Sequence, residues 1–545
     1  MSQKLVLYPL SSLAKVFLDG IYGEPFAGGS LLKNEEFSYQ VAYFADESRM
    51  ELRLEVDSPL ADCITVRSVG NVPSELPSFP GTDDNYLRKT PGLYPDPLFP
   101  VETPTAVAVP GRYHSLWITV KPDGKVSAGR YPVTLRFSSD EEEISESVTV
   151  YLEVIDALLP PQTLLYTEWF HADCIASYYD VEIFSEKHWE LIGKFMKTAA
   201  DNGMNMILTP VFTPPLDTVV GGERPTVQLV DVTKTVEGWS FGFDRLKRWC
   251  DLALASGITH FEISHFFTQW GAHWAPKVMA DVNGKQEQIF GWDTEATGKE
   301  YVGFLRAFCG ELDRFLKENG LADRTYFHVS DEPSSDQLES YRKTSELLSE
   351  LLPGYPVIDA LSDYSFCREG LVKIPIPAVN HIEPFLENHV SPLWTYYCCG
   401  QGIDVSNHFF SMPSARNRIL GEQLYKYDID GFLQWGYNFY YSALSKRTID
   451  PYLVTDSDGA FPSGDAFMVY PGKDCVVESL RLKVFAEALQ DLRAFRLLES
   501  RIGKEKVMEL IESGIEPITF SHYPKEESYI LRLREAVNAK IRETN

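Results

Sequence analysis

The sequence predicts a multidomain protein: an N-terminal all-β sandwich followed by an α/β domain, a (β/α)8 TIM-like barrel with extra C-terminal helices. Three observations predict this. The chain has 545 residues, enough for several domains, one of them a barrel of about 250 residues. Its first part alternates polar and apolar residues with a period of two. After about residue 158, short apolar runs alternate with amphipathic helical patterns. The expected domains are 1–157, 158–500 and 501–545, the last a helical extension packed on the barrel.

The N-terminal domain is expected to contain antiparallel strands. Period-two runs separated by turn residues occur at Phe37–Phe44, Met50–Val56, Ser115–Val120 and Val148–Val154. The proline-rich stretch 71–100 predicts an extended loop. Leu158-Leu-Pro-Pro161 interrupts strand and helix patterns alike, because proline lacks the N–H that both need, and this run predicts the domain boundary.

The second domain is expected to contain eight parallel strands. Their predicted positions are Leu165–Phe170, Met204–Leu208, His260–Ser264, Thr325–Val329, Pro356–Ile358, Ile376–Val379, Thr395–Cys398 and Gly431–Trp435. Helices are predicted at Ser185–Asn202, Asp244–Ser256, Lys299–Asn319, Ser334–Leu352, Ala415–Tyr427 and Ser479–Ser500. Ser or Asp begins several of them, and Gly203 and Gly257 follow two of them, as expected for helix caps.

Barrel enzymes place their chemistry where the strands end and the loops to the helices begin. The predicted strand ends of this chain carry aromatic, amide and carboxylate side chains. Such a rim is typical of a sugar site, because aromatic faces cover the apolar side of a pyranose while carboxylates and amides bind its hydroxyl groups.

Two adjacent carboxylates, Asp331 and Glu332, end the run Tyr326-Phe-His-Val-Ser-Asp331-Glu332-Pro333. Side chains alternate along an extended strand, so neighbours are not expected to face each other across a glycosidic bond as the opposed acids of most glycosidases do. A substrate-assisted mechanism fits the pair better. Glu332 would protonate the leaving oxygen while the 2-acetamido group of the substrate attacks, and Asp331 would orient that group.

Three alternatives stay open at this point. Asp331 could simply cap the helix predicted at 334–352, with Glu332 solvated. Glu332 could instead be paired with a distant carboxylate, Asp173, Asp359 or Glu383, in an opposed-acid glycosidase. The third alternative is a carbohydrate-binding protein without catalysis.

The chain resembles glycoside hydrolase family 123, the β-N-acetylgalactosaminidases. The resemblance rests on Trp169-Phe-His-Ala-Asp-Cys174, His-Val-Ser-Asp331-Glu332-Pro, Gln-Trp435-Gly-Tyr-Asn438 and Gly464-Asp-Ala-Phe-Met-Val-Tyr-Pro-Gly472 followed by Ser479-Leu-Arg-Leu. It implies an N-terminal β-sandwich, a (β/α)8 catalytic barrel and retaining hydrolysis through an oxazoline intermediate. It also places the catalytic pair of the family on Asp331 and Glu332, with Glu332 as the acid/base, and implies N-acetylgalactosamine as the preferred sugar.

Six further residues are predicted to bind the sugar. Trp435, Tyr437 and Asn438 follow the last strand, His265 follows the third, and Trp169 and His171 follow the first. For each, the plainer alternative is a buried residue of the core or a turn. Trp394, Tyr396 and Tyr397 alternate along a strand, so only one face of that strand is expected to reach the site.

Composition and motifs exclude other functions. The net charge of −28 opposes binding of a nucleic acid. Neither H-E-x-x-H, G-x-S-x-G nor G-x-G-x-x-G occurs, and His171-x-Asp173 is a weak metal motif, so no metal and no cofactor are expected. Eight cysteines without a C-x-x-C pair indicate reduced thiols. Without a recognisable signal peptide or membrane span we expect a cytoplasmic location, or secretion if a signal peptide was removed.

Overall fold

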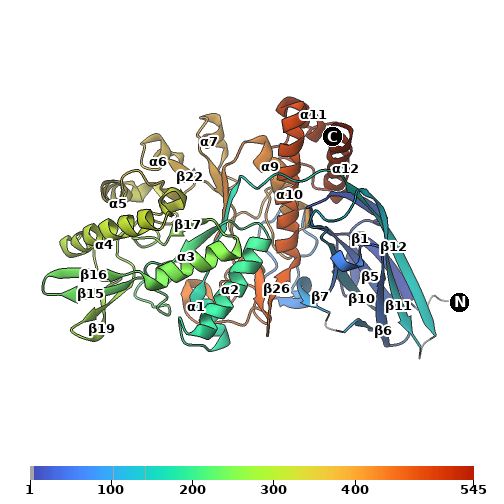
Figure 1. The fold of residues 1–545 in the computed structure, drawn as a ribbon, viewed down its shortest axis with the longest axis horizontal. Coiled ribbons are helices and arrows are strands. Elements are labelled where there is room, and N and C mark those ends of the chain that lie inside the picture. The colour runs from blue at the N-terminus through green and yellow to red at the C-terminus, as the bar shows by residue number, and fades with distance from the viewer. Residues whose placement is uncertain (1–4, 102, 141–142) are drawn as a thin grey trace.

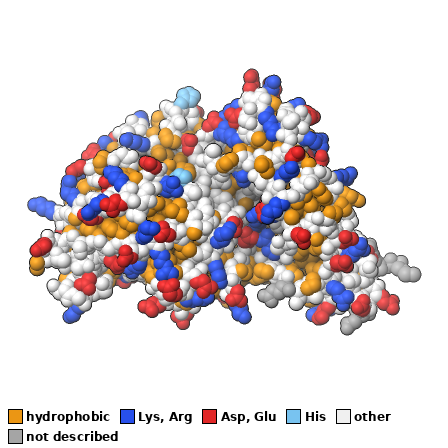
Figure 2. All heavy atoms as spheres, in the orientation of Figure 1, with side chains coloured by type: hydrophobic (Ala, Val, Ile, Leu, Met, Phe, Trp, Pro, Cys, Tyr) orange, Lys and Arg blue, Asp and Glu red, His pale blue; other side chains and the backbone are white. Residues whose placement is uncertain are grey.

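The computed structural model describes residues 5–101, 103–140 and 143–545. Figure 1 shows two halves: long strands from the N-terminal part form one, and an α/β part surrounded by helices forms the other. Helix α10 (Leu480–Ile502) stands between them. In the face shown in Figure 2, acidic and basic side chains are interspersed over both halves, so the net charge is not gathered into one patch there.

Two sheets pack face to face in the N-terminal half. One has the order β4 (Gly28–Leu32), β12 (Ile144–Ile155), β11 (Gly129–Ser139), β6 (Met50–Asp57) and β9 (Thr105–Ala108). The other has the order β1 (Leu5–Ser11), β5 (Phe37–Ala45), β10 (Arg112–Val120), β7 (Ile64–Ser74), β8 (Gly92–Pro100), β26 (Val476–Ser479) and β25 (Val469–Pro471). Alternate side chains of both sheets, such as Val41, Leu116, Leu135 and Phe137, share one buried core, as expected for a sandwich. A short hairpin, β2 (Lys15–Phe17) and β3 (Gly20–Tyr22), lies beside the second sheet.

The sandwich departs from the sequence prediction in two ways. The stretch 71–100 is not entirely a loop, because its first four residues belong to β7 and its last nine form β8. These two strands pair across a register shift between Val69 and Asn71. Prolines are tolerated there because the pairing is irregular and does not need every N–H. In addition, β25 and β26 come from the far end of the chain, and Glu478 pairs with Leu98. The two halves are therefore joined by a shared sheet, which a division at residue 157 did not anticipate.

The second half is mixed α/β. Its parallel strands are β13 (Leu165–Glu168), β14 (Met206–Thr209), β17 (His260–Ile263), β20 (Thr325–Phe327), β21 (Ile358–Ala360), β22 (Ile374–Ile376), β23 (Trp394–Tyr396) and β24 (Gly431–Gln434). Six of them form one sheet of order β20-β17-β14-β13-β24-β23, and β21 and β22 form a pair. Single parallel bridges, Phe327 to Val357 and Ala378 to Tyr396, connect the pair to the sheet. All eight predicted strands are present, within a few residues of their expected bounds.

The predicted helices are present too. The helices of this half are α1 (Ala172–Tyr179), α2 (Glu186–Asp201), α3 (Asp244–Ser256), α4 (Lys299–Glu318), α5 (Leu338–Leu351), α6 (Tyr364–Arg368), α7 (Glu383–Glu387), α8 (Ala415–Arg418) and α9 (Leu420–Lys426). Ser185 and Ser479 accept hydrogen bonds from the amides of His188 and Leu482 and so cap α2 and α10. The predicted helix 334–352 begins with a 3-10 turn, Ser335–Gln337, which Ser334 and Gln337 close with a capping box. Capping is therefore the role of Ser334, and the alternative that assigned it to Asp331 is wrong.

A small sheet and the C-terminal helices complete the fold. The strands β15 (Asp231–Thr235), β16 (Gly238–Gly242), β18 (Val278–Val282) and β19 (Lys285–Phe290) form a small sheet that projects beside α4 and was not predicted. The C-terminal helices are α11 (Lys504–Ile511) and α12 (Glu527–Glu543). Helix α12 contacts the sandwich as well as α10, since Glu535 accepts hydrogen bonds from the backbone and hydroxyl of Ser30. Within the described ranges, none of the helices has both the length and the apolar character of a membrane span.

Candidate active site

A pocket opens where the parallel strands of the α/β half end. Its empty volume, with the solvent at its mouth included, is about 720 Å³. It is lined by Trp169, His171, Leu216, Asp217, Gln269, Trp270, Asp331, Glu332, Ala360, Tyr396, Cys398, Cys399, Leu433, Trp435 and Phe461. Five of the eight sequence-predicted site residues are in this set: the two acids together with Trp169, His171 and Trp435.

The backbone leaves the extended conformation at the acidic pair. Glu332 has a φ of 42°, which non-glycine residues rarely adopt. Its N–H donates to the carbonyl of Ala360 at 3.0 Å, and the carbonyl of Asp331 accepts from the N–H of Trp270 at 2.9 Å. Strand alternation alone would send the two side chains to opposite faces, but this local turn lets both line the same pocket.

The two acids have different surroundings. Glu332 is the more exposed, and the hydroxyl of Tyr396, which comes from β23, donates a hydrogen bond to its Oε1 atom. Asp331 is half-buried. Burial raises the pKa of Asp331 well above its usual range, the neighbouring Glu332 carboxylate raises it further, and the charge of His328 opposes both.

His328 is held between two buried carboxylates. Its Nε2 atom lies 2.9 Å from Glu262 Oε2 and its Nδ1 atom 3.3 Å from Asp359 Oδ1. Although burial opposes the charge, these partners raise the pKa of His328 to about 9, so the ring is an imidazolium at neutral pH. Asp359 also accepts from the backbone N–H of Val329 and from the hydroxyl of Tyr341. A fixed positive charge therefore lies close to Asp331.

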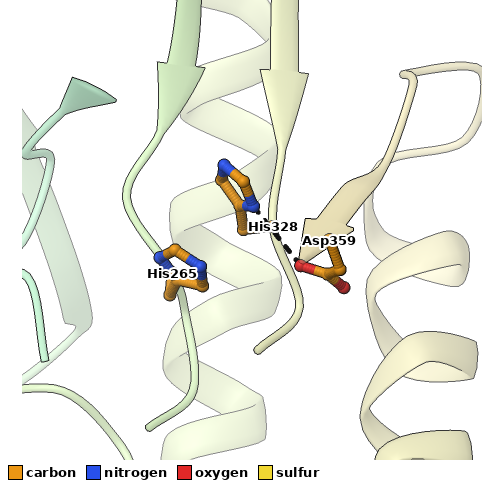
Figure 3. A group of neighbouring side chains, drawn as sticks. All are labelled: His265, His328 and Asp359. Atoms are coloured by element: carbon orange, nitrogen blue, oxygen red, sulfur yellow. Dashed lines mark hydrogen bonds and ion pairs between the residues drawn. The ribbon is translucent and has the colours of Figure 1, made fainter. Parts of the chain in front are cut away.

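His265, His328 and Asp359 could be taken for a metal site, because their donor atoms lie within 4.8 Å of one another. Figure 3 shows the two imidazoles one above the other, with a bond from His328 to Asp359. The ring centroids are 4.2 Å apart and the ring planes 20° apart. A ring nitrogen binds metal in the plane of its ring, so nearly parallel stacked rings do not point their lone pairs at one ion. The group fits a hydrogen-bonded charge network better than a metal centre.

His171 and Asp173 are fixed by a buried arginine. Arg224 donates from Nε and Nη2 to the two oxygens of Asp173, both at 2.8 Å, and Nη2 also lies 3.0 Å from His171 Nδ1. His171 Nε2 then donates to the carbonyl of Trp435 at 3.1 Å. Burial, together with Arg224, lowers the pKa of His171 to about 3 and keeps the ring neutral. The His-x-Asp motif is thus a structural clamp that supports one wall of the pocket.

The structure places the other three predicted contacts behind the pocket wall. His265 is buried and packs against Trp169 and His328, and neither of its ring nitrogens has a hydrogen-bond partner among the residues that the structure describes. Tyr437 is buried, with its hydroxyl donating to the carbonyl of Phe195. Asn438 exchanges two hydrogen bonds with the backbone of His171. Their positions near a strand end were predicted correctly, but their side chains turn into the core.

Trp435 lines the pocket and is held by Asp465 and Phe461. Its indole N–H donates to Asp465 Oδ2 at 3.0 Å, and its ring contacts Phe461 edge to face at 5.2 Å between centroids. Burial raises the pKa of Asp465 to about 7.

None of the carboxylates proposed for an opposed pair lines the pocket. Asp173 is hydrogen-bonded to Arg224 and Asp359 to His328, and Glu383 lies at the exposed start of α7.

Several lining residues were missed from the sequence. Asp217 is the most consequential, because it is a third carboxylate in the pocket. It has a φ of 39°, its Oδ2 accepts from the N–H of Leu444 at 2.8 Å, and burial raises its pKa. Gln269 and Trp270 also line the pocket and were not predicted as site residues. Tyr396 fits the prediction that one face of its strand reaches the site, and Tyr397 packs on the other side against Phe432.

The profile of the catalytic domain of glycoside hydrolase 123 matches residues 169–498, more than half of the chain. No curated protein sequence matches the chain. Among solved structures, a family 123 glycoside hydrolase from Clostridium perfringens, analysed for the details of glycolipid glycan hydrolysis, superposes with a TM-score of 0.77 at 16% identity, covering 99% of both chains. At that identity the likeness shows the fold alone.

Two other solved structures are much less similar. An endo-β-1,4-mannanase from Thermotoga petrophila has a TM-score of 0.35 at 14% identity, covering 61% of this chain and 77% of its own. A β-glucuronidase from Parabacteroides merdae has a TM-score of 0.31 at 10% identity, covering 87% and 50%. Neither likeness carries an argument about this protein.

Proposed function

Because the chain belongs to glycoside hydrolase family 123, we propose that it is a retaining hydrolase that releases terminal β-linked N-acetylhexosamine, with N-acetylgalactosamine preferred. The observation that carries this proposal is the adjacent pair Asp331 and Glu332, both lining one aromatic pocket. The indoles of Trp169, Trp270 and Trp435 in its lining give the pocket aromatic surface for the apolar side of a sugar ring.

In the proposed reaction the acetamido carbonyl oxygen of the substrate attacks the anomeric carbon while the bond to the leaving oxygen breaks. Glu332 gives its proton to that oxygen, and Tyr396 holds the Glu332 carboxyl in place through its hydroxyl. Asp331 accepts a hydrogen bond from the acetamido N–H and stabilises the positive charge of the oxazolinium ring. Glu332, now a carboxylate, then removes a proton from water as the water opens the ring. Two displacements at the same carbon retain the configuration.

We infer further that the eight parallel strands form a (β/α)8 barrel. Side chains of β14, β21, β22, β23 and β24, among them Met206, Ile358, Ile376, Trp394 and Leu433, share one buried cluster, as the interior of a barrel requires. At the two single bridges, neighbouring strands of the barrel are joined by one bridge each in place of a continuous ladder. This arrangement accounts for the position of the pocket at the strand ends.

The sugar and its carrier are part of the proposal. The preference for N-acetylgalactosamine rests on the family resemblance. A glycolipid glycan is a natural class of substrate to test, since the structure from Clostridium perfringens was analysed for hydrolysis of such glycans. The chemistry of the pocket itself supports a 2-acetamido sugar.

Asp217 supports a second candidate function. It brings another carboxylate into the pocket that contains Glu332, so an opposed-acid glycosidase acting on sugars without an acetamido group is the alternative. In that mechanism Asp217, and not the substrate, would supply the nucleophile or the base.

One experiment separates the two. Release of nitrophenol is measured from the β-N-acetylgalactosaminide, the β-N-acetylglucosaminide and the β-galactoside, with the wild type, Asp331→Asn and Asp217→Asn. Substrate assistance predicts cleavage of acetamido sugars only, with the larger loss in Asp331→Asn. Cleavage of the plain galactoside, lost in Asp217→Asn, would contradict the proposal and favour the alternative.

A further inference from the structure

Two adjacent cysteines, Cys398 and Cys399, lie in the wall of the catalytic pocket. They follow β23 directly, and both line the cavity with Glu332 and Trp435. Both are free thiols of intermediate exposure. In the proposed reaction neither has a part.

The two thiols lie side by side. The side chains of Cys398 and Cys399 are hydrogen-bonded, and this contact, followed by burial, raises the pKa of the Cys398 thiol. The turn that presents them is closed by Gln401, whose N–H donates to the carbonyl of Cys398 at 3.1 Å and whose Oε1 accepts from the Cys398 N–H at 2.8 Å. Asn407 donates to the same carbonyl at 2.9 Å. The pair is therefore ordered before any ligand arrives.

The electrostatic surroundings of the pair favour a cation. Glu332 and Asp465 are close enough for their carboxylates to disfavour a thiolate at Cys398, and Asp331 and Asp217 line the same cavity. A cation that displaces the thiol protons removes this repulsion, because it brings positive charge to a site with several carboxylates. Thiolate ligands select soft or borderline cations over Mg²⁺ and Ca²⁺.

We propose that Cys398 and Cys399 form a chelating site for a thiophilic divalent cation, of which Cd²⁺ and Zn²⁺ are examples, and that the bound cation blocks the pocket. Each S–H bond releases its proton to water and each sulfur forms a bond to the cation. The remaining positions of the cation are available to water. The site thus makes hydrolysis sensitive to thiophilic metals, a consequence that rests on the proposed function.

Binding is tested with Cd²⁺ as the probe, on the full chain. Thiolate-to-cadmium charge transfer gives a near-ultraviolet absorption that does not depend on turnover. We expect this absorption in the wild type at one equivalent of Cd²⁺, and its loss in Cys398→Ser and in Cys399→Ser. Cys63→Ser is the matched control, because Cys63 is also a half-exposed free thiol but lies in the sandwich. If the absorption is unchanged in both pocket variants, or is lost equally in the control, the proposal of a cation site at Cys398 and Cys399 is wrong.

Blocking is tested separately on hydrolysis of the nitrophenyl N-acetylhexosaminide, with each variant compared with its own metal-free rate. Cd²⁺ is expected to raise the KM of the wild type about tenfold at concentrations that leave both pocket variants within about twofold. Equal inhibition by Mg²⁺ would place the cation on the carboxylates and overturn the proposal. If the wild type does not hydrolyse the substrate, the proposed function fails, and the absorption still decides whether the dithiol site exists.

Discussion

Asp331 and Glu332 are consecutive residues that the fold places in different surroundings. Glu332 lies on the exposed side of the pocket with Tyr396, and Asp331 lies deeper, close to the imidazolium of His328. General acid catalysis matters most when the leaving group is poor, whereas orientation of the acetamido group matters for every substrate.

Substitutions at the pair should therefore separate by leaving group. We expect Glu332→Gln to lower kcat/KM for a disaccharide about 100-fold or more while retaining much of the activity on a nitrophenyl glycoside. Asp331→Asn should lose both activities. The measurement is kcat/KM on the two substrates, and small, equal effects of the two changes would show that the roles are misassigned.

His328 should set the acid limb of the pH profile. In the proposed mechanism Asp331 must be ionised to stabilise the oxazolinium ring. Burial and Glu332 raise the pKa of Asp331, and the positive charge of His328 lowers it. Replacing His328 by Gln removes that charge, so the acid limb of kcat/KM should move to higher pH. The change also leaves Glu262 and Asp359 without a cationic partner, which should destabilise the fold by about 3 kcal/mol or more.

His260→Gln is the control for that experiment, because His260 begins β17 at the other end of the strand from the site. Its acid limb should coincide with that of the wild type. An acid limb that stays in place, or moves to lower pH, in His328→Gln would refute this role of His328.

Sequence reasoning located the elements of the α/β half better than its side chains. The eight parallel strands, β13, β14, β17 and β20 to β24, were found because buried parallel strands are short continuous apolar runs. The small sheet β15, β16, β18 and β19 was missed because its strands interrupt a strand-to-helix connection and are largely exposed. The sequence could not show that Asp217 lines the pocket, or that Glu332 lines it together with Asp331. Both positions depend on backbone turns with positive φ, which no side-chain pattern marks.

The packing of α9 on α10 depends on a glycine. A Cβ atom at Gly421 would lie 2.5 Å from the carbonyl oxygen of Ala488, a backbone atom that cannot move without shifting α10. We expect Gly421→Ala to destabilise the protein by about 1–3 kcal/mol, measured by urea denaturation.

Gly310 offers the matched control. It lies inside α4, is exposed, and a Cβ atom there would have nothing within 4 Å. Gly310→Ala should stabilise by about 0.5–1 kcal/mol, since alanine loses less backbone entropy in a helix. A destabilisation of similar size in both variants would mean that close packing at α10 is not the reason.

At the scale of the whole molecule, several buried groups bind protons more tightly in the folded state than in the unfolded chain. Burial raises the pKa of Glu168 from 4.5 to about 8 and that of Asp465 from 3.8 to about 7. Although burial opposes it, the carboxylates around His328 raise its pKa from 6.5 to about 9. The stability contributed by such groups is fully present below their unfolded pKa values and is lost as the pH rises through the folded ones.

Thermal stability should therefore decline from about pH 6.5 to about pH 9. Below pH 6.5 His171, whose pKa is lowered to about 3 by burial and Arg224, adds stability as the pH rises, and above pH 7 the lowered pKa of buried Lys15 offsets part of the decline. Glu478, whose pKa is lowered to about 2 by Lys483 and Arg67 against the effect of burial, acts in the opposite direction only below pH 4.5. The measurement is the denaturation midpoint across this pH range. Glu168→Gln should flatten the decline between pH 6.5 and 8, and a midpoint that rises with pH in that range would contradict the predicted sign.

The sheet that joins β8 to β26 has a consequence for synthesis on the ribosome. Strand β8 emerges early, but its neighbour β26 is translated several hundred residues later. At about 5–20 residues per second, the edge of β8 waits tens of seconds for its partner. During that interval the nascent chain exposes an unpaired strand edge, so cellular yield should depend on chaperones that bind such edges until translation passes residue 479.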